Sequence, residues 1–204
     1  MAADAEQRII DLYQRHADDW ARERGDRLVL EKNWLDRFTA LLPEAATVLD
    51  LGCGSGMPIA GHLIERGCRV TGVDSSPAMI GRCARRFPGH EWLVGDMRTS
   101  APDRTFHGIL AWDSFFHLAP DDQRRMFPVF GTRAAAGAAL MFTSGPTADV
   151  RIGTYHGEPL YHASLDSDEY RELLHVNGFE VVAHIAEDPG CGLHTVWLAR
   201  RAER

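Results

Sequence analysis

The stretch that most constrains the fold of this chain is VLDLGCGSG at residues 48–56, where an apolar run meets three alternate glycines. Short apolar runs bounded by glycine are typical of buried strands. Glycine lets the chain turn sharply and lets a ligand approach the backbone closely. A helical pattern resumes after the turn, with Pro58 at its start. The stretch therefore predicts a strand, a tight turn and a helix, the unit from which α/β folds are built.

Strands and helices go on alternating along the chain, which predicts a Rossmann-like, doubly wound α/β fold. Two amphipathic helices, over residues 9–20 and 30–42, precede the first strand. Alternating elements imply right-handed crossovers and a mostly parallel sheet. Two strands near the end, 179–185 and 193–199, are joined by a short turn and predict an antiparallel final hairpin, which makes seven strands. The other five expected strands are 47–51, 69–74, 91–95, 106–112 and 138–143, with helices near 58–66, 77–86, 120–135 and 166–177.

Composition and charge argue against several classes of function. The formal net charge is −7, and no basic stripe of the kind that binds nucleic acid is present. No apolar run reaches the length of a membrane span and the first residues do not resemble a signal peptide, so we expect a cytoplasmic protein without a membrane partner. We also expect no metal site: Asp188, Cys191, His184 and His194 fall near one turn, but their spacing matches no common ligand pattern.

The glycine motif differs from the dinucleotide fingerprint GxGxxG. Gly52 and Gly54 match it, but Met57 stands at the third glycine position. Asp50 lies two residues before the first glycine, and a carboxylate there would repel a pyrophosphate and suit a cationic group. The motif therefore favours a ligand with an amino group over a dinucleotide.

Two further carboxylates come at the ends of the next two strands. Asp74 ends the second strand, where an acidic residue accepts hydrogen bonds from ribose hydroxyls in nucleotide-binding folds. Asp96 follows the third strand, where it can accept a hydrogen bond from an adenine amine. Three successive strand ends thus predict sites for an amine, a ribose and an adenine, which together describe a nucleoside that carries an amino acid.

The segments VLDLGCGSG, VTGVDSS and VGDMR resemble the successive cofactor motifs of class I S-adenosylmethionine-dependent methyltransferases. The resemblance covers residues 40–200, including the antiparallel final hairpin, and is closest to small bacterial members of one domain. It implies S-adenosylmethionine as cofactor and S-adenosylhomocysteine as product. The cofactor residues that it implies are Gly52, Gly54, Gly56 and Asp50 for the methionine part, Asp74 with Ser75 and Met79 for the ribose, and Asp96 with Met97 for the adenine.

The loop after the fourth strand, WDSFFH at residues 112–117, holds the candidate catalytic residues Asp113 and His117. His117 could act as a general base or orient the acceptor, because the pKa of histidine lies near neutrality. It could equally be a loop histidine that packs under the next helix. Trp112 could face the sulfonium of the cofactor or belong to the core.

We expect one domain of residues 1–204, in which residues 1–43 cover the cofactor site and residues 44–143 form the cofactor-binding core. Residues 144–164 have no periodicity, and a long aperiodic loop in a small domain is usually functional, so we expect a lid. Residues 165–204 complete the domain with the final helix and hairpin. Candidate acceptor contacts in the lid are Tyr155, His156, Tyr161 and His162, and the first helix offers Tyr13 and Trp20 to close the other side of the cofactor.

The function expected from these features is methyl transfer from S-adenosylmethionine to a small molecule, held in line with the methyl group. One alternative is an NAD-dependent oxidoreductase, which the residues at positions 50 and 57 disfavour. Another is a non-catalytic regulator that binds S-adenosylmethionine or S-adenosylhomocysteine. The expected partner is a small-molecule acceptor, and the chain is expected to be a monomer or a homodimer.

Overall fold

The structure is a computed structural model and describes residues 5, 6 and 8–203. The first four residues of the expected N-terminal segment lie outside the described residues, as do Gln7 and Arg204. Within the described part of the chain, no helix is long and apolar enough to cross a membrane. The elements are α2 (Ile9–Arg15), α3 (Ala17–Arg24), α4 (Lys32–Thr39), β1 (Thr47–Leu51), α5 (Ile59–Glu65), β2 (Arg69–Asp74), α6 (Pro77–Arg86), β3 (Glu91–Val94), β4 (Phe106–Ala111), η1 (Phe115–His117), α7 (Pro120–Arg133), β5 (Ala134–Ser144), β6 (Asp149–Tyr155), β7 (Glu158–Ser164), α8 (Ser167–Val176), β8 (Phe179–Asp188), η2 (Pro189–Cys191) and β9 (His194–Arg201).

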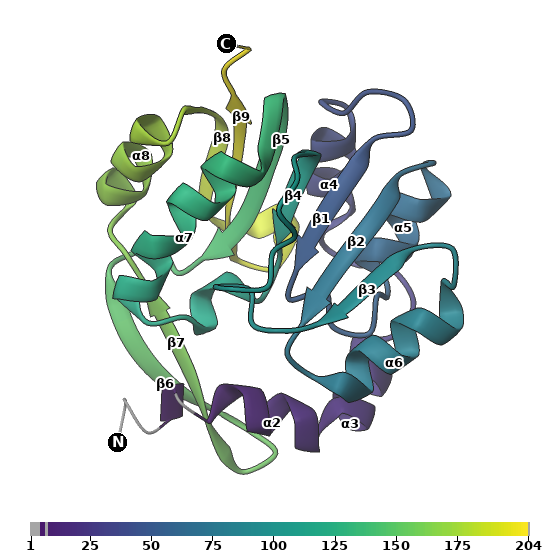
Figure 1. Cartoon of the computed structure of the whole chain (residues 1–204). Helices are drawn as coiled ribbons and strands as arrows, with labels where there is room; N and C mark the ends of the chain where they lie inside the picture. Colours follow the sequence, from purple (N-terminus) through teal and green to yellow (C-terminus); the bar gives the residue numbers. More distant parts are fainter. Residues whose placement is uncertain (1–4, 7, 204) are drawn as a thin grey trace.

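A seven-stranded sheet forms the centre of the molecule, with the strand order β3-β2-β1-β4-β5-β9-β8 (Figure 1). Strands β1 to β5 run parallel to one another, and β9 runs antiparallel to both β5 and β8. The strand order reverses between β1 and β4, which is where doubly wound sheets bind their ligands. The predicted Rossmann-like sheet with an antiparallel final hairpin is confirmed.

Local sequence explains where the helices begin. The hydroxyl of Ser76 accepts a hydrogen bond from the backbone N–H of Met79 at 3.3 Å, which caps α6 directly before Pro77. Pro120 begins α7 in the same way, since proline is favoured at the first position of a helix. The side chain of Asp166 caps α8 by accepting from the N–H of Asp168. These start signals explain why the bounds of the three helices follow the sequence pattern closely.

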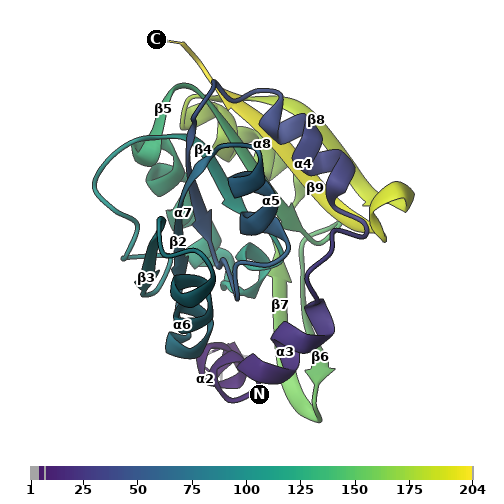
Figure 2. The ribbon, with the colours of Figure 1, turned by 90° about the vertical axis from the view of Figure 1, so that its right-hand side faces the viewer.

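Helices cover both faces of the sheet (Figure 2). On one face α4 and α5 bury Trp34 and Phe38 against β1, β4 and β5. On the other face α7 and α8 bury Phe127, Phe130 and Tyr170 against the same sheet. Each fully buried side chain of this size contributes roughly 1.5–3 kcal/mol to stability. The two cores hold the parallel strands rigid, so that the loops at their carboxyl ends have fixed positions.

The N-terminal helices α2 and α3 lie across the carboxyl ends of the parallel strands, beside α6 (Figure 1). The sequence predicted one helix over 9–20, but the structure divides it at His16, where the backbone leaves the helical conformation. Polar contacts attach the pair to α6: the hydroxyl of Ser76 donates to Gln14 at 2.6 Å, and Arg82 pairs with Asp18. We call α2 and α3 together the roof.

Residues 144–164, which we expected to form a long aperiodic loop, have regular structure instead, and their role as a lid stays a prediction. They form a two-stranded antiparallel hairpin of β6 and β7, separate from the main sheet. The turn of the hairpin is His156-Gly157, and both residues have positive φ, 48° and 80°, as expected for a two-residue hairpin turn. The hairpin extends beyond the sheet and contacts α2, so it closes the side of the roof (Figures 1 and 2).

Candidate functional site

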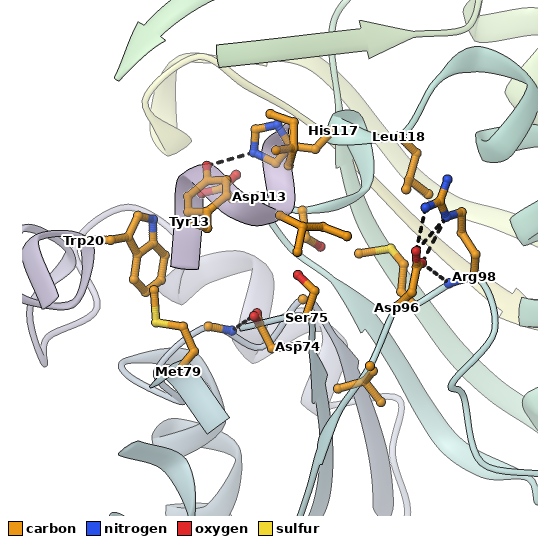
Figure 3. A pocket seen from close by; sticks show the side chains of 18 of the residues that line it. Tyr13, Trp20, Asp74, Ser75, Met79, Asp96, Arg98, Asp113, His117 and Leu118 are labelled. Carbon is orange, nitrogen blue, oxygen red and sulfur yellow. Dashed lines mark hydrogen bonds and ion pairs between the residues drawn. The ribbon is translucent and has the colours of Figure 1, made fainter. Parts of the chain in front are cut away.

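A cavity of about 290 Å³ lies between the carboxyl ends of the parallel strands and the roof (Figure 3). Its volume is at the lower end of the range for small-molecule sites. Most of the predicted cofactor residues meet here, together with residues from the roof and from the loop after β4. The lining consists of Glu6, Ile9, Ile10, Tyr13, Trp20, Gly52, Gly54, Val73, Asp74, Ser75, Met79, Gly95, Asp96, Met97, Arg98, Asp113, Ser114, His117 and Leu118.

The glycine turn after β1 forms one wall of the cavity. Gly52 and Gly54 both have positive φ, 77° and 53°, which other residues adopt at a cost. A Cβ atom at Gly52 would lie 2.3 Å from the Cβ of Ser114, and one at Gly54 would lie 2.7 Å from the indole of Trp20. The backbone N–H of Gly52 donates to the carbonyl of Val73 at 2.8 Å, which joins the turn to the end of β2. Both glycines are therefore required by backbone conformation and by close packing.

The carboxylate of Asp74 lies at the end of β2 and holds the glycine turn in place. Its Oδ2 accepts from the N–H of Gly54 at 2.8 Å, and its Oδ1 accepts from the N–H of Ser76 at 2.9 Å. Burial raises the pKa of Asp74, although both backbone hydrogen bonds act in the opposite direction. Each carboxylate oxygen has two lone pairs, so one on each oxygen remains for a ligand that donates hydrogen bonds.

Asp96 lines the cavity at the end of β3 and is paired with an arginine that the sequence analysis did not single out. Arg98 donates from Nε to both carboxylate oxygens of Asp96 at 3.0 Å, and it also pairs with Asp122 of α7. Burial alone would raise the pKa of Asp96, but the hydrogen bonds from Arg98 outweigh it, so the pKa is lowered. Asp96 is therefore held as an anion in a fixed orientation beside Met97.

The roof contributes aromatic side chains to the cavity. Tyr13 comes from α2 and Trp20 from α3, and the Trp20 indole lies beside Met79 and above the glycine turn (Figure 3). Tyr13 is directed toward the loop after β4, where its hydroxyl meets His117. The faces of aromatic rings attract cations, so this wall suits a positively charged ligand group.

His117 is buried between the roof and the hairpin. Its Nδ1 is 2.7 Å from the backbone carbonyl of Tyr161 on β7, and its Nε2 is 2.9 Å from the hydroxyl of Tyr13. A carbonyl can only accept, so Nδ1 carries the proton and Nε2 accepts from Tyr13. Burial lowers the pKa of His117 to about 4. The imidazole is therefore neutral near neutral pH and can accept a hydrogen bond at Nε2.

The structure does not pair Asp113 with His117. Asp113, at φ 50°, lies 3.0 Å from Nε2 of His194, the first residue of β9. The Nδ1 of His194 is 2.7 Å from the carbonyl of Cys191, so both ring nitrogens face acceptors. The hydrogen bond to Asp113 raises the pKa of His194, with burial acting against it. Asp113, which lines the cavity, is thus paired with His194, and this hydrogen bond favours the charged form of the imidazole.

Three predicted cofactor residues lie outside the lining of the cavity. Asp50 is 3 % exposed on β1, beneath the glycine turn, and Gly56 packs against Cys83 of α6. Trp112 belongs to the core beside α4 and stacks on His194, with ring centroids 5.6 Å apart. Their roles in binding the cofactor remain predictions.

The four candidate acceptor residues of the hairpin are also outside this lining. Tyr155 and His156 both reach Glu23 of α3, each at 3.0 Å. The Tyr161 side chain is buried beside Ile9, while its carbonyl supports His117. His162 lies 4.9 Å from His117 between ring centroids and lines a second cavity of about 280 Å³ between the hairpin and β5. The hairpin thus supports the cavity from outside.

Several lining residues were missed by the sequence analysis. Ile9 and Ile10 belong to the apolar stripe of the first helix, which gave no reason to separate cavity from core. Ser114 fills the space beside Gly52 and donates to the carbonyl of Leu51 at 2.7 Å. Arg98 directly follows the third motif, and its charge beside Asp96 was a signal that could have been used.

Comparison with known sequences gives a matching family model and many curated relatives. A family model described as a methyltransferase domain matches residues 48–131, from β1 into α7. The trans-aconitate 2-methyltransferase of Azoarcus sp. (strain BH72) is 41 % identical over 92 residues, which cover 44 % of this chain and 32 % of that protein. The chain spans less than half the length of the curated relatives it matches. The segment matched by the family model contains the three cofactor motifs.

Comparison of folds extends the likeness over nearly the whole chain. The 1,6-didemethyltoxoflavin-N1-methyltransferase of Burkholderia thailandensis, solved with S-adenosylhomocysteine, matches with a TM-score of 0.72 and 22 % identity, and covers 98 % of this chain and 88 % of that one. The magnesium protoporphyrin IX methyltransferase of Synechocystis PCC 6803, solved with S-adenosylmethionine, has a TM-score of 0.72 and 18 % identity over 97 % of both chains. S-adenosylmethionine and S-adenosylhomocysteine, which are bound in these structures, are the cofactor and the product that the sequence predicts for this chain.

Proposed function

We propose that this chain is a class I S-adenosylmethionine-dependent methyltransferase and that it transfers a methyl group from S-adenosylmethionine to a small organic acceptor. One observation carries the proposal. The residues of three separate sequence motifs line a single cavity at the reversal point of the sheet, with aromatic side chains across from them. The acceptor enters this proposal only as a small molecule, because the roof and the hairpin leave a cavity rather than an open surface.

The donor set of the cavity fits this cofactor. S-adenosylmethionine supplies a methyl group on a sulfonium, a good leaving group for direct displacement. Asp74 has lone pairs for two ribose hydroxyls, and Asp96 with Met97 stands where an adenine amine would be recognised. Tyr13 and Trp20 offer ring faces to a sulfonium cation. An anionic pyrophosphate, by contrast, would meet Asp74, Asp96 and no unpaired cation among the described lining residues.

In this proposal the residues on the acceptor side orient the acceptor and exclude water. His117 is neutral and presents Nε2 to Tyr13, so an acceptor hydroxyl or amine can replace the Tyr13 hydroxyl as the donor to that nitrogen. A histidine with a pKa of about 4 is a weak base, and its main contribution is therefore alignment of the nucleophile. Ile9, Ile10 and Leu118 are apolar and keep water from the reacting atoms.

Calorimetric titration tests the proposal. Wild-type protein is expected to bind S-adenosylmethionine and S-adenosylhomocysteine but not NAD. Asp74→Asn is expected to weaken both adenosyl ligands by tenfold or more, because a hydrogen bond to a charged group contributes about 1.5–3 kcal/mol. Asp103→Asn is the matched control, since Asp103 is 95 % exposed in the loop before β4 and does not line the cavity.

The outcomes separate the proposal from its alternatives. Folded protein that binds neither adenosyl ligand would overturn the methyltransferase proposal, and NAD binding in their place would support the oxidoreductase. Tight adenosyl binding with no methyl transfer to any acceptor in a broad panel of acids, amines, phenols and thiols would support the regulator.

A further inference from the structure

A group of metal-ligating side chains lies outside the cavity, where the roof meets the tip of the hairpin. His16 is the residue between α2 and α3, and Asp19 is in the first turn of α3. His156 is at the turn between β6 and β7. One ligand atom from each of these three residues can be chosen so that all three atoms lie within 4.8 Å of one another. We call these three residues the clasp.

The two imidazoles of the clasp are arranged side by side. The rings of His16 and His156 are stacked, with centroids 4.8 Å apart and planes at 17°. The Nδ1 of His16 faces Oδ2 of Asp19 at 3.8 Å, while the other oxygen of Asp19 is bound by Arg22. Ligand atoms around a tetrahedral zinc ion are roughly 3.3 Å apart, given bond lengths of about 2.0–2.1 Å. A movement of about 1.5 Å by these partly exposed side chains would bring the three atoms together.

Each of the two imidazoles already has a carboxylate as the hydrogen-bond partner of its Nε2. Glu158 accepts from Nε2 of His16 at 2.9 Å, and Glu23 accepts from Nε2 of His156 at 3.0 Å. With the proton on Nε2, the lone pair of each neutral ring is at Nδ1. Metal-binding histidines are almost always oriented in this way, by a carboxylate or carbonyl on the nitrogen that does not bind the metal. This second observation separates the clasp from an ordinary surface cluster of polar residues.

We propose that the clasp binds a divalent transition-metal ion of the zinc type through Nδ1 of His16, Nδ1 of His156 and one carboxylate oxygen of Asp19. Two imidazoles and a carboxylate suit zinc, and a water completes the tetrahedron. The ion has a structural effect in this proposal, because the three residues do not line the cavity and His156 is exposed. The sequence gave no sign of it, since positions 16 and 156 are far apart in the chain.

The position of the clasp links the ion to the cavity. His16 lies between Tyr13 on α2 and Trp20 on α3, the two aromatic residues of the roof. Tyr155, next to His156, stacks on Tyr13 with centroids 6.2 Å apart. An ion that joins His16 to His156 therefore holds the hairpin tip against the roof. We expect the ion to slow the escape of a ligand from the cavity, an effect that rests on the proposed cofactor site.

Cobalt(II) in place of zinc tests the site through its visible absorption. One equivalent of Co²⁺ is expected to produce the spectrum of a tetrahedral site in untagged wild-type protein, and Zn²⁺ is expected to abolish it. His156→Gln should eliminate the spectrum, and Glu23→Gln should weaken Co²⁺ binding by roughly 10–100-fold through loss of the supporting carboxylate. His175→Gln, at an exposed position on α8, is the matched control and should bind as wild type does.

A cobalt spectrum that is absent, or that survives His156→Gln and His16→Gln, overturns the metal site. A second measurement tests its effect on the cavity: S-adenosylhomocysteine should dissociate more slowly with Zn²⁺ than with a chelator, and the difference should vanish in His156→Gln. Equal rates would overturn the role of the ion in closing the cavity. The cobalt spectrum does not depend on the cofactor, so protein that binds the metal but no adenosyl ligand contradicts the proposed function alone.

Discussion

Asp50 allows a quantitative test of the electrostatics beneath the glycine turn. Its side chain is 3 % exposed on β1, and burial, followed by the charge of Asp74, raises its pKa from 3.8 to about 7. In the unfolded chain Asp50 ionises near pH 4, whereas in the folded protein it stays protonated up to about pH 7. The favourable contribution of the protonated form is therefore complete below pH 4 and is lost as the pH rises through 7.

The size of the effect follows from linkage. A shift of about three pKa units corresponds to about 4 kcal/mol at pH 8, at 1.36 kcal/mol for each unit. At pH 5 the loss of stability from Asp50 is only about 1.7 kcal/mol, because this pH is only about one unit above the pKa of Asp50 in the unfolded chain. Asp50→Asn has a similar shape and no charge. Relative to wild type, the variant should therefore gain about 2.5 kcal/mol of stability between pH 5 and pH 8.

Urea denaturation of wild type and Asp50→Asn at pH 5 and pH 8 measures this difference. Contributions from titrating groups that do not interact with Asp50 are common to both proteins and cancel when the two are compared at each pH, whereas its interaction with Asp74 is part of the measured difference. Asp103→Asn serves as the exposed control and should follow wild type. Parallel stability curves for wild type and Asp50→Asn, with equal m-values, would refute the idea that Asp50 is buried as a neutral acid.

Three further predictions concern the cavity walls. Gly54→Ala should lower stability by about 1–2 kcal/mol, because alanine is strained at φ 53°, and calorimetry should detect weaker S-adenosylhomocysteine binding; unchanged values would contradict the packing described. Tyr13→Phe removes the donor to Nε2 of His117 and should cost about 1–3 kcal/mol of unfolding free energy, which urea denaturation would test. His194→Gln removes the partner of Asp113, and its loss of stability should be largest below pH 6.5 and shrink as the pH rises through the raised pKa of His194; a loss that does not change between pH 6 and pH 9 would contradict the ion pair.

The cofactor half of the site could be predicted because its signals are local. The predicted strands 47–51 and 69–74 match β1 and β2, the glycine turn follows β1 directly, and Asp74 is the last residue of β2. Parallel strands with crossovers bring successive carboxyl ends to the same edge of a sheet. Residues that directly follow consecutive strands therefore come close together without any further information. Gly52, Gly54, Asp74 and Asp96 line one cavity for this reason.

The hairpin was missed because almost all of β6 is exposed. The residues of this strand pair only with β7, and Val150 and Ile152 remain 43 % and 45 % exposed. A strand without a buried face has no need of alternating apolar residues, so periodicity cannot detect it. Its turn is His156-Gly157 rather than Asn-Gly, which removes the other common signal of a hairpin.

The pairings around the reacting centre could not be predicted for a different reason. Asp113 and His117 are four residues apart, which suggested a common role, yet each has a partner from a distant element. Asp113 meets His194 at the start of β9, and His117 meets Tyr13 of α2. These contacts depend on how the roof, the final hairpin and the loop after β4 pack together. A single sequence contains no local pattern for such contacts.

The difference between local signals and contacts between distant elements also divides the proposed site into a cofactor half and an acceptor half. The cofactor half is built by strand ends and is held by backbone contacts, such as those of Asp74 to Gly54. The acceptor half depends on His117, whose nitrogens contact α2 on one side and β7 on the other. A change in the roof or in the β6–β7 hairpin would therefore move His117 and leave Asp74 in place. Acceptor choice is thus expected to change with Tyr13 and with residues 149–164, which position His117, while the proposed ribose and adenine contacts of Asp74 and Asp96 follow β2 and β3.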